Sequence, residues 1–140
     1  MSNHNNLEER HISYYIKDYV EYIRQQFYHY LETTPKHRIK SYDIEVLKEK
    51  YESTLKIDRT SSKKYTKIIS LNIHFKFPII HSYILNRDDN LHGKDFKKGD
   101  IFGKTDFFNQ PNRKRTLGNV FLKNYHTTWY KPLDNPNNKS

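Results

Sequence analysis

The hydrophobic pattern of this chain changes its period once, near residue 60. Before that point, apolar residues return every three to four positions, which is the period of a helix packed on one side. Between Ile69 and Phe77, apolar and polar residues alternate, which is the period of a strand with one buried face. The change of period predicts an α+β fold in which helices come first and strands follow.

Two helices are expected in the first half. The first spans about 7–33, with an apolar stripe formed by Ile12, Ile16, Tyr19, Ile23, Phe27 and Tyr30. It should end before Pro35, because a proline ring disfavours helical geometry in the residue before it. The second should begin at Ser41, a suitable N-cap, and run to about Ile57. The short connection favours an antiparallel helical hairpin.

The second half is expected to form a small, mostly antiparallel sheet on which the helical hairpin packs. The sheet should be built from residues 65–85 and 118–131, with strands at 69–77, 79–85 and 120–130. Pro78 either ends the first of these strands or marks a sheet edge, because proline cannot donate a hydrogen bond to a neighbouring strand.

A long polar segment interrupts this sheet. Residues 86–118 contain all four glycines and read as loops. A loop of that length is unusual in so small a domain, so we expect it to be functional or to be ordered by a partner. The polar tail from about residue 132 is expected to be disordered.

The apolar content limits how large the core can be. Only 34% of the 140 residues are hydrophobic, against about 45–50% in a typical soluble protein. Alanine is absent, whereas 12 tyrosines and 8 phenylalanines are present. We therefore expect a thin, tyrosine-rich core, or a core that a partner completes. The absence of cysteine excludes disulfides, thiolate metal sites and cysteine nucleophiles.

The net charge of +9 lies entirely in the second half of the chain. Residues 1–60 hold 10 Lys/Arg and 10 Asp/Glu, whereas residues 61–140 hold 15 Lys/Arg and 6 Asp. This split predicts two segments of one domain with different tasks. The neutral helical segment would dock on protein, and the basic β and loop segment would meet negative charge.

One stretch resembles part of a phosphate-binding loop. Gly103-Lys104-Thr105 matches the end of that motif, but Gly99 is one position too close, and the flanking residues fit neither a buried strand nor a helix. We interpret the stretch as a turn. The eight histidines show no metal-ligand spacing. We therefore expect no cofactor, metal ion or small-molecule ligand.

The loop aspartates allow two interpretations. A metal-dependent nuclease could gather carboxylates there around a divalent cation. Aspartates in loops more often stabilise turns, because their side chains accept hydrogen bonds from nearby backbone N–H groups. We expect the second use, and no catalytic residue, for Asp88, Asp89, Asp95, Asp100 and Asp106.

Basic residues and aromatic rings are interleaved in the region 97–131. Cations neutralise phosphates, and aromatic rings stack on unpaired bases. We expect nucleic acid or an acidic partner to bind there through Lys97, Lys98, Lys104, Arg113, Lys114, Arg115, Lys123, Tyr125 and Trp129. On the first helix, Tyr14 and Tyr28 fall on the polar half, where a tyrosine suits a protein interface.

These features favour a non-catalytic structural or assembly subunit of a larger complex, docked through its tyrosine-rich helices and basic loop. Abundant Lys, Asn, Ile and Tyr without Ala is typical of A+T-rich genomes, so a viral particle or an organellar ribonucleoprotein fits. The alternatives are a free nucleic-acid-binding protein that uses 97–131, and a small metal-dependent nuclease. No motif identifies a known family.

The expected location is a virion or the inside of a cell or organelle. No apolar run approaches the roughly 20 residues of a membrane span. Residues 1–6 lack the apolar stretch of a secretory signal. We therefore expect protein partners or self-assembly, with nucleic acid as a further possible partner, and no membrane.

Overall fold

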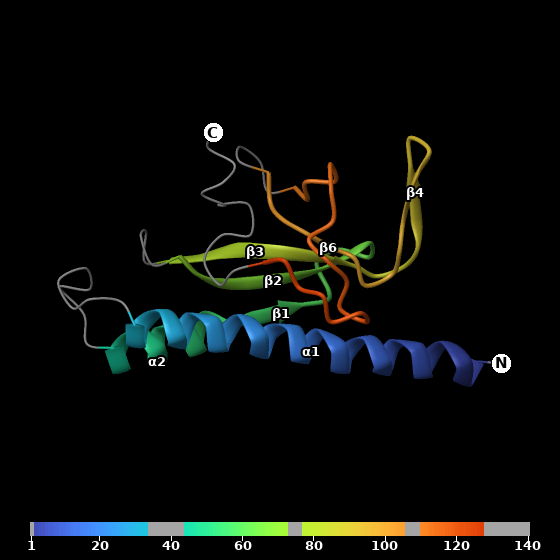
Figure 1. Cartoon of the computed structure of the whole chain (residues 1–140). Coiled ribbons are helices and arrows are strands. Elements are labelled where there is room, and N and C mark those ends of the chain that lie inside the picture. The colour runs from blue at the N-terminus through green and yellow to red at the C-terminus, as the bar shows by residue number, and fades with distance from the viewer. Residues whose placement is uncertain (1, 34–43, 73–76, 106–109, 128–140) are drawn as a thin grey trace.

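The computed structural model describes residues 2–33, 44–72, 77–105 and 110–127. Two helices lie on one face of a four-stranded sheet, and a small hairpin stands off the opposite face (Figure 1). The α+β prediction and the helical hairpin packed on a mostly antiparallel sheet are confirmed. The elements are α1 (Ser2–Thr33), α2 (Ile44–Thr54), β1 (Lys56–Asp58), β2 (Tyr65–Asn72), β3 (Phe77–Leu85), β4 (Asp89–Leu91), β5 (Lys94–Phe96) and β6 (Ile101–Phe102).

The main sheet has the strand order β1-β2-β3-β6, and each neighbouring pair is antiparallel. Consecutive strands are therefore neighbours, except where the hairpin β4–β5 intervenes before β6. In this arrangement the start of β2 and the end of β3 meet at the same end of the sheet. The hairpin leaves the sheet from that end (Figure 1).

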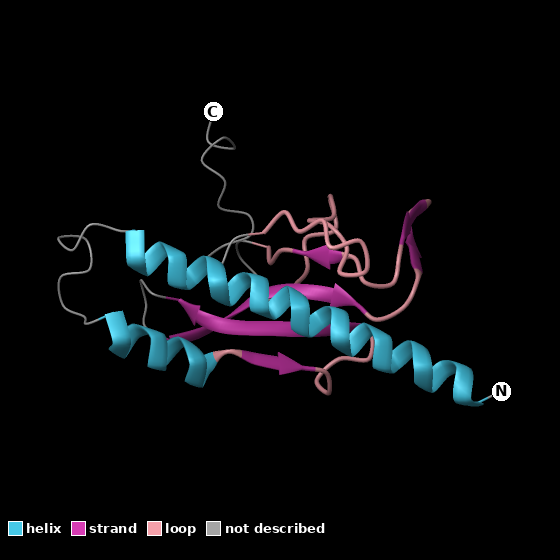
Figure 2. Ribbon diagram, turned by 60° about the horizontal axis from the view of Figure 1, so that its bottom comes forward, coloured by secondary structure: helices cyan, strands magenta, loops and turns pink. Residues whose placement is uncertain are grey.

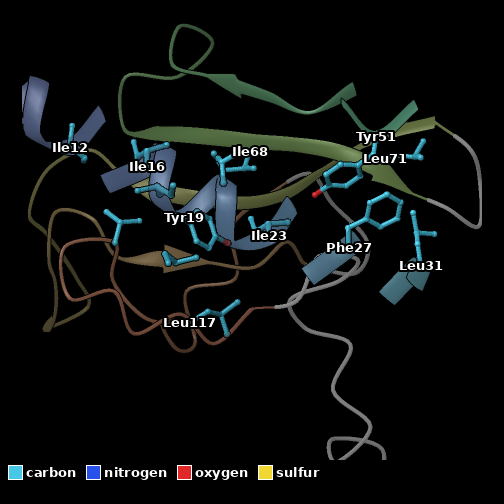
Figure 3. Close-up of a cluster of buried hydrophobic side chains, with 14 of the residues drawn as sticks. Ile12, Ile16, Tyr19, Ile23, Phe27, Leu31, Tyr51, Ile68, Leu71 and Leu117 are labelled. Carbon is cyan, nitrogen blue, oxygen red and sulfur yellow. The ribbon is translucent and has the colours of Figure 1, made fainter. Parts of the chain in front are cut away.

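Helix α1 lies diagonally across the sheet, with α2 running beside it in the opposite direction (Figure 2). Its apolar stripe is buried as predicted, with Tyr30 half-buried at the C-terminal end. The rings of Phe27 and Tyr51 stack with centroids 4.2 Å apart and join the two helices (Figure 3). Neither helix of the described chain combines the length and the apolar character of a membrane span.

The second helix is shorter than predicted. It ends at Thr54, whose hydroxyl donates hydrogen bonds to the carbonyls of Lys50 and Tyr51. Ile57 belongs instead to β1, where it pairs with Ile68. Helical spacing alone could not reveal this pairing, because the partner lies in a distant segment. The predicted cap at Ser41 lies outside the described residues.

The predicted strand at 69–77 is divided between two strands. β2 already begins at Tyr65, and Phe77 opens β3. The prediction of a strand at 79–85 is confirmed within β3. Pro78 does not end a strand. It pairs with Leu71 on the half of β3 that β6 does not reach, which agrees with its interpretation as an edge residue.

A bulge shifts the register between β2 and β3. Ile68 pairs with Ser82 but Ile69 pairs with Ile80, which leaves His81 as an extra residue in β3. His81 is buried, and its Nδ1 lies 3.1 Å from Ser82 Oγ. That hydroxyl lies 2.9 Å from the buried hydroxyl of Tyr19 on α1. The bulge therefore brings polar groups of β3 into contact with the helix.

The prediction of a strand at 120–130 is wrong for its described part. Residues 120–123 form a turn instead, and 128–130 lie outside the described residues. Gly118 and Lys123 have φ values of 107° and 54°, which an extended strand cannot accommodate. Asn124 Oδ1 accepts the N–H of Asn119, and Asn119 Oδ1 accepts the N–H of Phe121. Local side-chain bonds thus hold the turn.

The segment that leads into this turn covers the outer edge of β6. The N–H of Ile101 donates to the carbonyl of Gly118, and the N–H of Leu117 donates to the carbonyl of Ile101. The ring of Phe121 then packs on Tyr15 of α1 at 4.9 Å. Residues 117–121 therefore tie the sheet edge to the first helix.

The described parts of 86–118 contain more order than predicted. β4 and β5 are joined by His92 and Gly93, whose φ values of 53° and 78° fit a two-residue type I′ hairpin turn. β6 follows in the main sheet. Contacts within the chain hold these parts, so the expectation that a partner orders the loop loses its support. The predicted tail from 132 lies outside the described residues.

Candidate polyanion interface

The cations predicted to form one binding surface occupy different environments in the structure. Arg113 is half-buried, Lys123 lies against α1, and Lys104 is half-buried beside a bridge to Pro111. Lys97, Lys114 and Arg115 are exposed, and Lys98 is half-buried. Trp129 lies outside the described residues. The structure therefore divides the predicted set rather than bringing it together.

Arg113 is part of the protein's own packing. Its side chain is 12% exposed, and its Nη2 lies 2.7 Å from Asp89 Oδ2. The guanidinium lies 4.5 Å from the ring centroid of Phe96 and 5.7 Å from that of Phe102. A planar cation held between a carboxylate and two rings gains from both kinds of contact. Arg113 could therefore bind a partner, as predicted from the sequence, only if these contacts were broken.

Asp89 joins three segments of the chain. Its Oδ2 lies 2.9 Å from Lys64 Nζ as well as 2.7 Å from Arg113 Nη2. The hydrogen bonds from Lys64 and then Arg113 lower the pKa of Asp89 to about 2. The start of β2, the start of β4 and the turn at 113–115 are thus held around one carboxylate.

Lys123 and Tyr125 belong to the segment that packs against α1. Lys123 Nζ lies 3.2 Å from Asp18 Oδ2. The ring of Tyr125 lies 5.2 Å from Tyr19 and 4.8 Å from Tyr22, and burial raises the pKa of its hydroxyl. These two residues contribute to the attachment of the C-terminal segment. The predicted stacking of Tyr125 on nucleic-acid bases has no support in this arrangement.

Seven exposed cations lie on the hairpin β4–β5, beside it, and at the end of the sheet from which it leaves, and we call this set the basic end. It consists of Lys63, Lys64, Arg87, Lys94, Lys97, Lys114 and Arg115. They come from four segments of the chain, and hydrogen bonds link these segments to one another.

Asn86 links the start of β2 to the end of β3. Its backbone N–H donates to the carbonyl of Lys64 at 2.9 Å, and its Nδ2 donates to the carbonyl of Lys63 at 3.0 Å. Its Oδ1 accepts the hydroxyl of Thr66 at 2.7 Å. Arg87 follows directly. The cations of 63–64 and Arg87 are therefore placed beside each other.

The turn at 97–100 attaches to the same place. The N–H of Gly99 donates to the carbonyl of Leu85 at 2.8 Å, and the N–H of Lys98 donates to Asp88 Oδ1 at 2.8 Å. Within the turn, the N–H of Lys97 donates to Asp100 Oδ2 at 2.8 Å. These bonds bring the turn that carries Lys97 next to the end of β3, from which Arg87 follows.

Lys94 connects the hairpin to the turn at 113–115. Its Nζ donates to the carbonyl of Lys114 at 2.8 Å and lies 5.6 Å from the ring centroid of Phe96. Lys114 and Arg115 are exposed beside this contact. The basic end therefore extends along the hairpin, whose tip is exposed at 92–95, to the turn at 113–115.

The prediction that the loop aspartates stabilise turns is confirmed for Asp88 and Asp100, whereas Asp89 forms ion pairs with Lys64 and Arg113 instead. Asp88 and Asp100 accept backbone N–H groups, and Asp95 Oδ1 accepts the amide of Asn90 at 2.7 Å. Asp106 lies outside the described residues. Within the described ranges, no three His, Asp or Glu side chains lie together in a way that could hold a metal ion.

The two tyrosines predicted at a protein interface differ in their surroundings. Tyr14 is 66% exposed on α1. Tyr28 is half-buried between the helices, where its hydroxyl donates to Glu52 and Lys48 Nζ lies 5.0 Å from its ring centroid. Burial, together with the bond to Glu52, raises the pKa of Tyr28 to about 12. Tyr28 thus serves the helical hairpin, and its expected exposure is corrected.

Four members of the basic end were missed from the sequence: Lys63, Lys64, Arg87 and Lys94. The antiparallel pairing of β2 with β3 brings the first three together, because the start of one strand meets the end of the next. A sequence reading that treated 65–72 and 77–85 as one hairpin would have placed them at one end. The position of Lys94 depends on the hairpin turn at His92-Gly93, for which the sequence pattern predicts only a loop.

Comparison with known protein families, characterised proteins and solved structures finds no significant match for this chain.

Proposed function

We propose that this protein is a non-catalytic assembly subunit of a larger complex, and that it docks through its basic end onto a polyanionic partner. A viral particle or an organellar ribonucleoprotein would provide such a partner. One observation carries the proposal. In the described part of the chain, no carboxylate lies within ion-pair distance of six of the seven cations, namely Lys63, Arg87, Lys94, Lys97, Lys114 and Arg115.

Unpaired cations repel one another when they are held together on one surface. Each like-charge pair costs a few tenths of a kcal/mol, roughly the size of a favourable surface ion pair. Here the fold adds to this cost by fixing four cationic segments around Asn86, Asp88 and Asp89. A partner of opposite charge would relieve the repulsion, and this supports a docking role for the basic end.

The tyrosine-rich helices support this role less than the sequence suggested. Five of the six tyrosines in α1 are buried or half-buried within the chain, and Tyr14 alone is exposed. The proposed docking surface therefore moves from the helices to the basic end. Tyr14 is kept as a secondary contact.

The alternative of a free protein that stacks bases on 97–131 is less well supported. Among the described aromatic residues of that region, Phe102 is buried and Phe121 and Tyr125 pack against α1. The cations of the region are still available to a partner. Polyanion docking without base stacking is the form of the hypothesis that the geometry favours.

The test is native isolation of the tagged chain from expressing cells, with mass spectrometry and the ratio of absorbance at 260 nm to that at 280 nm. The variant Arg87→Glu/Lys97→Glu reverses two cations of the basic end. The control, Lys17→Glu/Lys56→Glu, makes the same charge change on exposed residues of α1 and β1. We expect the bound partner to be lost from the first variant and kept by the control. Equal recovery from both would overturn the proposal.

A further inference from the structure

We infer that the polyanion bound by the basic end is a double-stranded nucleic acid, contacted through its phosphates and not through its bases. This inference rests on the proposed docking role of the basic end and names the partner of that site. It is carried by three features of the surface: its lack of exposed apolar residues, the spread of its charges around the hairpin, and the burial of its aromatic rings.

The basic end lacks the apolar centre that protein interfaces use. Among the described residues, the large apolar side chains that are exposed are Tyr14, Val46, Phe77 and Leu122, and none belongs to the four segments of the basic end. Protein interfaces are typically enriched in aromatic residues and Arg, and depleted in Lys. Here Arg113 is withdrawn into the protein, and Lys provides five of the seven exposed cations. This surface suits a partner that offers charge alone.

The charges are distributed rather than concentrated in a pocket. Lys63, Arg87 and Lys97 belong to segments that meet around Asn86 and the turn at 97–100. Lys94, Lys114 and Arg115 belong to the segments joined by the contact of Lys94 with the carbonyl of Lys114. A phosphate backbone presents regularly spaced charges along its length, and a protein can neutralise several of them with separate lysines.

The burial of the rings favours a duplex over a single strand. Proteins that bind single strands without sequence preference typically offer exposed aromatic rings on which the bases stack. Around the basic end, Tyr65, Phe96 and Phe102 are buried, and the rings of Phe96 and Phe102 pack edge to face at 5.3 Å. In a duplex the bases are already stacked on one another, so binding needs only the phosphates, and these lie at higher charge density than in a single strand.

The experiment measures fluorescence anisotropy of a labelled DNA duplex of about two helical turns, titrated with the intact chain at several salt concentrations. A second duplex of unrelated sequence, a single strand of the same length and polyglutamate serve as competitors. The variants are Arg87→Glu/Lys97→Glu, Lys114→Glu/Arg115→Glu and the control Lys17→Glu/Lys56→Glu. Urea unfolding of each variant verifies that it is folded.

We expect both duplexes to bind equally, with an affinity that falls steeply between about 50 and 200 mM salt. Each basic-end variant should lower the affinity about tenfold or more, and it should reduce the slope of log affinity against log salt by about 2, because two phosphate contacts are lost. The control should change both quantities much less, since its cations lie outside the basic end.

Several results would overturn the inference. Equal losses in the control and the basic-end variants would show that only net charge matters. Tighter binding of the single strand would show that bases are contacted. Stronger binding of polyglutamate than of duplex, lost in the basic-end variants, would identify an acidic protein as partner and leave the proposed docking role intact. If no duplex binds while partner recovery in cells still depends on Arg87 and Lys97, the inference of a duplex partner is overturned and the proposed docking role stands.

Discussion

The two faces of the sheet are held by different physical means. On the helix side, aliphatic residues and tyrosines from α1, α2 and the sheet form a large apolar cluster, which includes Ile23, Phe27 and Ile84. On the hairpin side lies a small cluster of Tyr65, Tyr83, Leu85, Phe96 and Phe102, and the cation of Arg113 contacts the rings of Tyr65, Phe96 and Phe102. Neighbouring residues contribute to opposite faces, as Ile84 and Tyr83 do in β3.

This difference shows how a chain with few aliphatic residues can still order a basic region. The helix side provides most of the apolar burial and hence most of the stability. The hairpin side has too few apolar residues for that, and it relies on an ion pair and on cation–ring contacts around Asp89 and Arg113. We therefore expect the helix side to be sensitive to cavities, and the hairpin side to be sensitive to charge and acid.

The largest effect is expected on the helix side. Phe27→Ala would leave a cavity beside Tyr51 where a fully buried ring now stacks, and it should lower the free energy of unfolding by about 3–5 kcal/mol. The control Val46→Ala lies on the exposed side of α2, where we expect a change within about 0.5 kcal/mol. Urea unfolding followed by circular dichroism measures both. Similar small values for the two would refute a core centred under α1.

The next largest loss of stability is expected at Gly118, which lies beside the edge of β6. Gly118 has φ of 107°, and a Cβ there would overlap the carbonyl oxygen of Asn124. Gly118→Ala should cost about 2–4 kcal/mol, because left-handed geometry and a backbone clash both oppose it. Gly93→Ala, at φ of 78° with open space around the Cβ position, should cost only about 1–2 kcal/mol. The midpoints of urea unfolding compare the stabilities of the two variants, and equal midpoints would contradict the turn geometry at 118–124.

On the hairpin side, Arg113 should matter more than its neighbour Arg115. Arg113→Ala removes the ion pair with Asp89 and the contact over Phe96, so we expect a loss of about 2–3 kcal/mol. Arg113→Lys keeps the charge but loses the planar contact, and it should recover about half of that loss. Because Arg115 is exposed, Arg115→Ala should change the free energy of unfolding by no more than about 0.5 kcal/mol. Chemical unfolding that ranks Arg115 above Arg113 would disprove this arrangement.

The same cluster should respond to acid. Asp89 has a folded-state pKa of about 2, below its ordinary value of about 3.9. Its contribution to stability is therefore fully present above the ordinary value and is lost as the pH falls from about 4 to about 2. The difference in free energy of unfolding between wild type and Asp89→Asn should shrink across this window. A difference that stays constant between pH 4 and pH 2 would argue against the ion-pair account.

The helix-side fold could be predicted because its signals are local and periodic. The stripe from Ile12 to Tyr30 and the change of period near residue 60 identified α1 and the strands that follow. The errors lie where distant pairing or local side-chain bonds outweigh the pattern. Ile57 joins β1 because Ile68 pairs with it, and 120–123 turns because of Asn119 and Asn124.

The site was less predictable, because its members come from four separate segments. Lys97, Lys114 and Arg115 were identified from the density of charge in the loop region. Arg113, beside them in sequence, turns inward to Asp89, and no local signal distinguishes it from its neighbours. Tyr125 was expected to face a partner but packs on Tyr19 and Tyr22. Burial depends on tertiary contacts, which a run of basic and aromatic residues does not specify.

The smallest effect on stability, but the largest on binding, is expected at the basic end. Arg87→Glu/Lys97→Glu changes two exposed side chains, so the free energy of unfolding should shift by no more than about 0.5 kcal/mol per residue. The affinity for duplex DNA should fall at the same time. Urea unfolding and anisotropy of one preparation test both, and parallel losses would indicate misfolding instead of a lost contact.

The most direct test of the division between the two faces is amide hydrogen exchange with and without a bound DNA duplex. We expect new protection in 63–64, 86–89, 94–99 and 113–116, where the basic end and its turns lie. Exchange along the described part of α1 from Ile12 to Thr33 should be unchanged, because that helix packs on the opposite face of the sheet (Figure 1). Protection along α1 with none at the basic end would contradict the account.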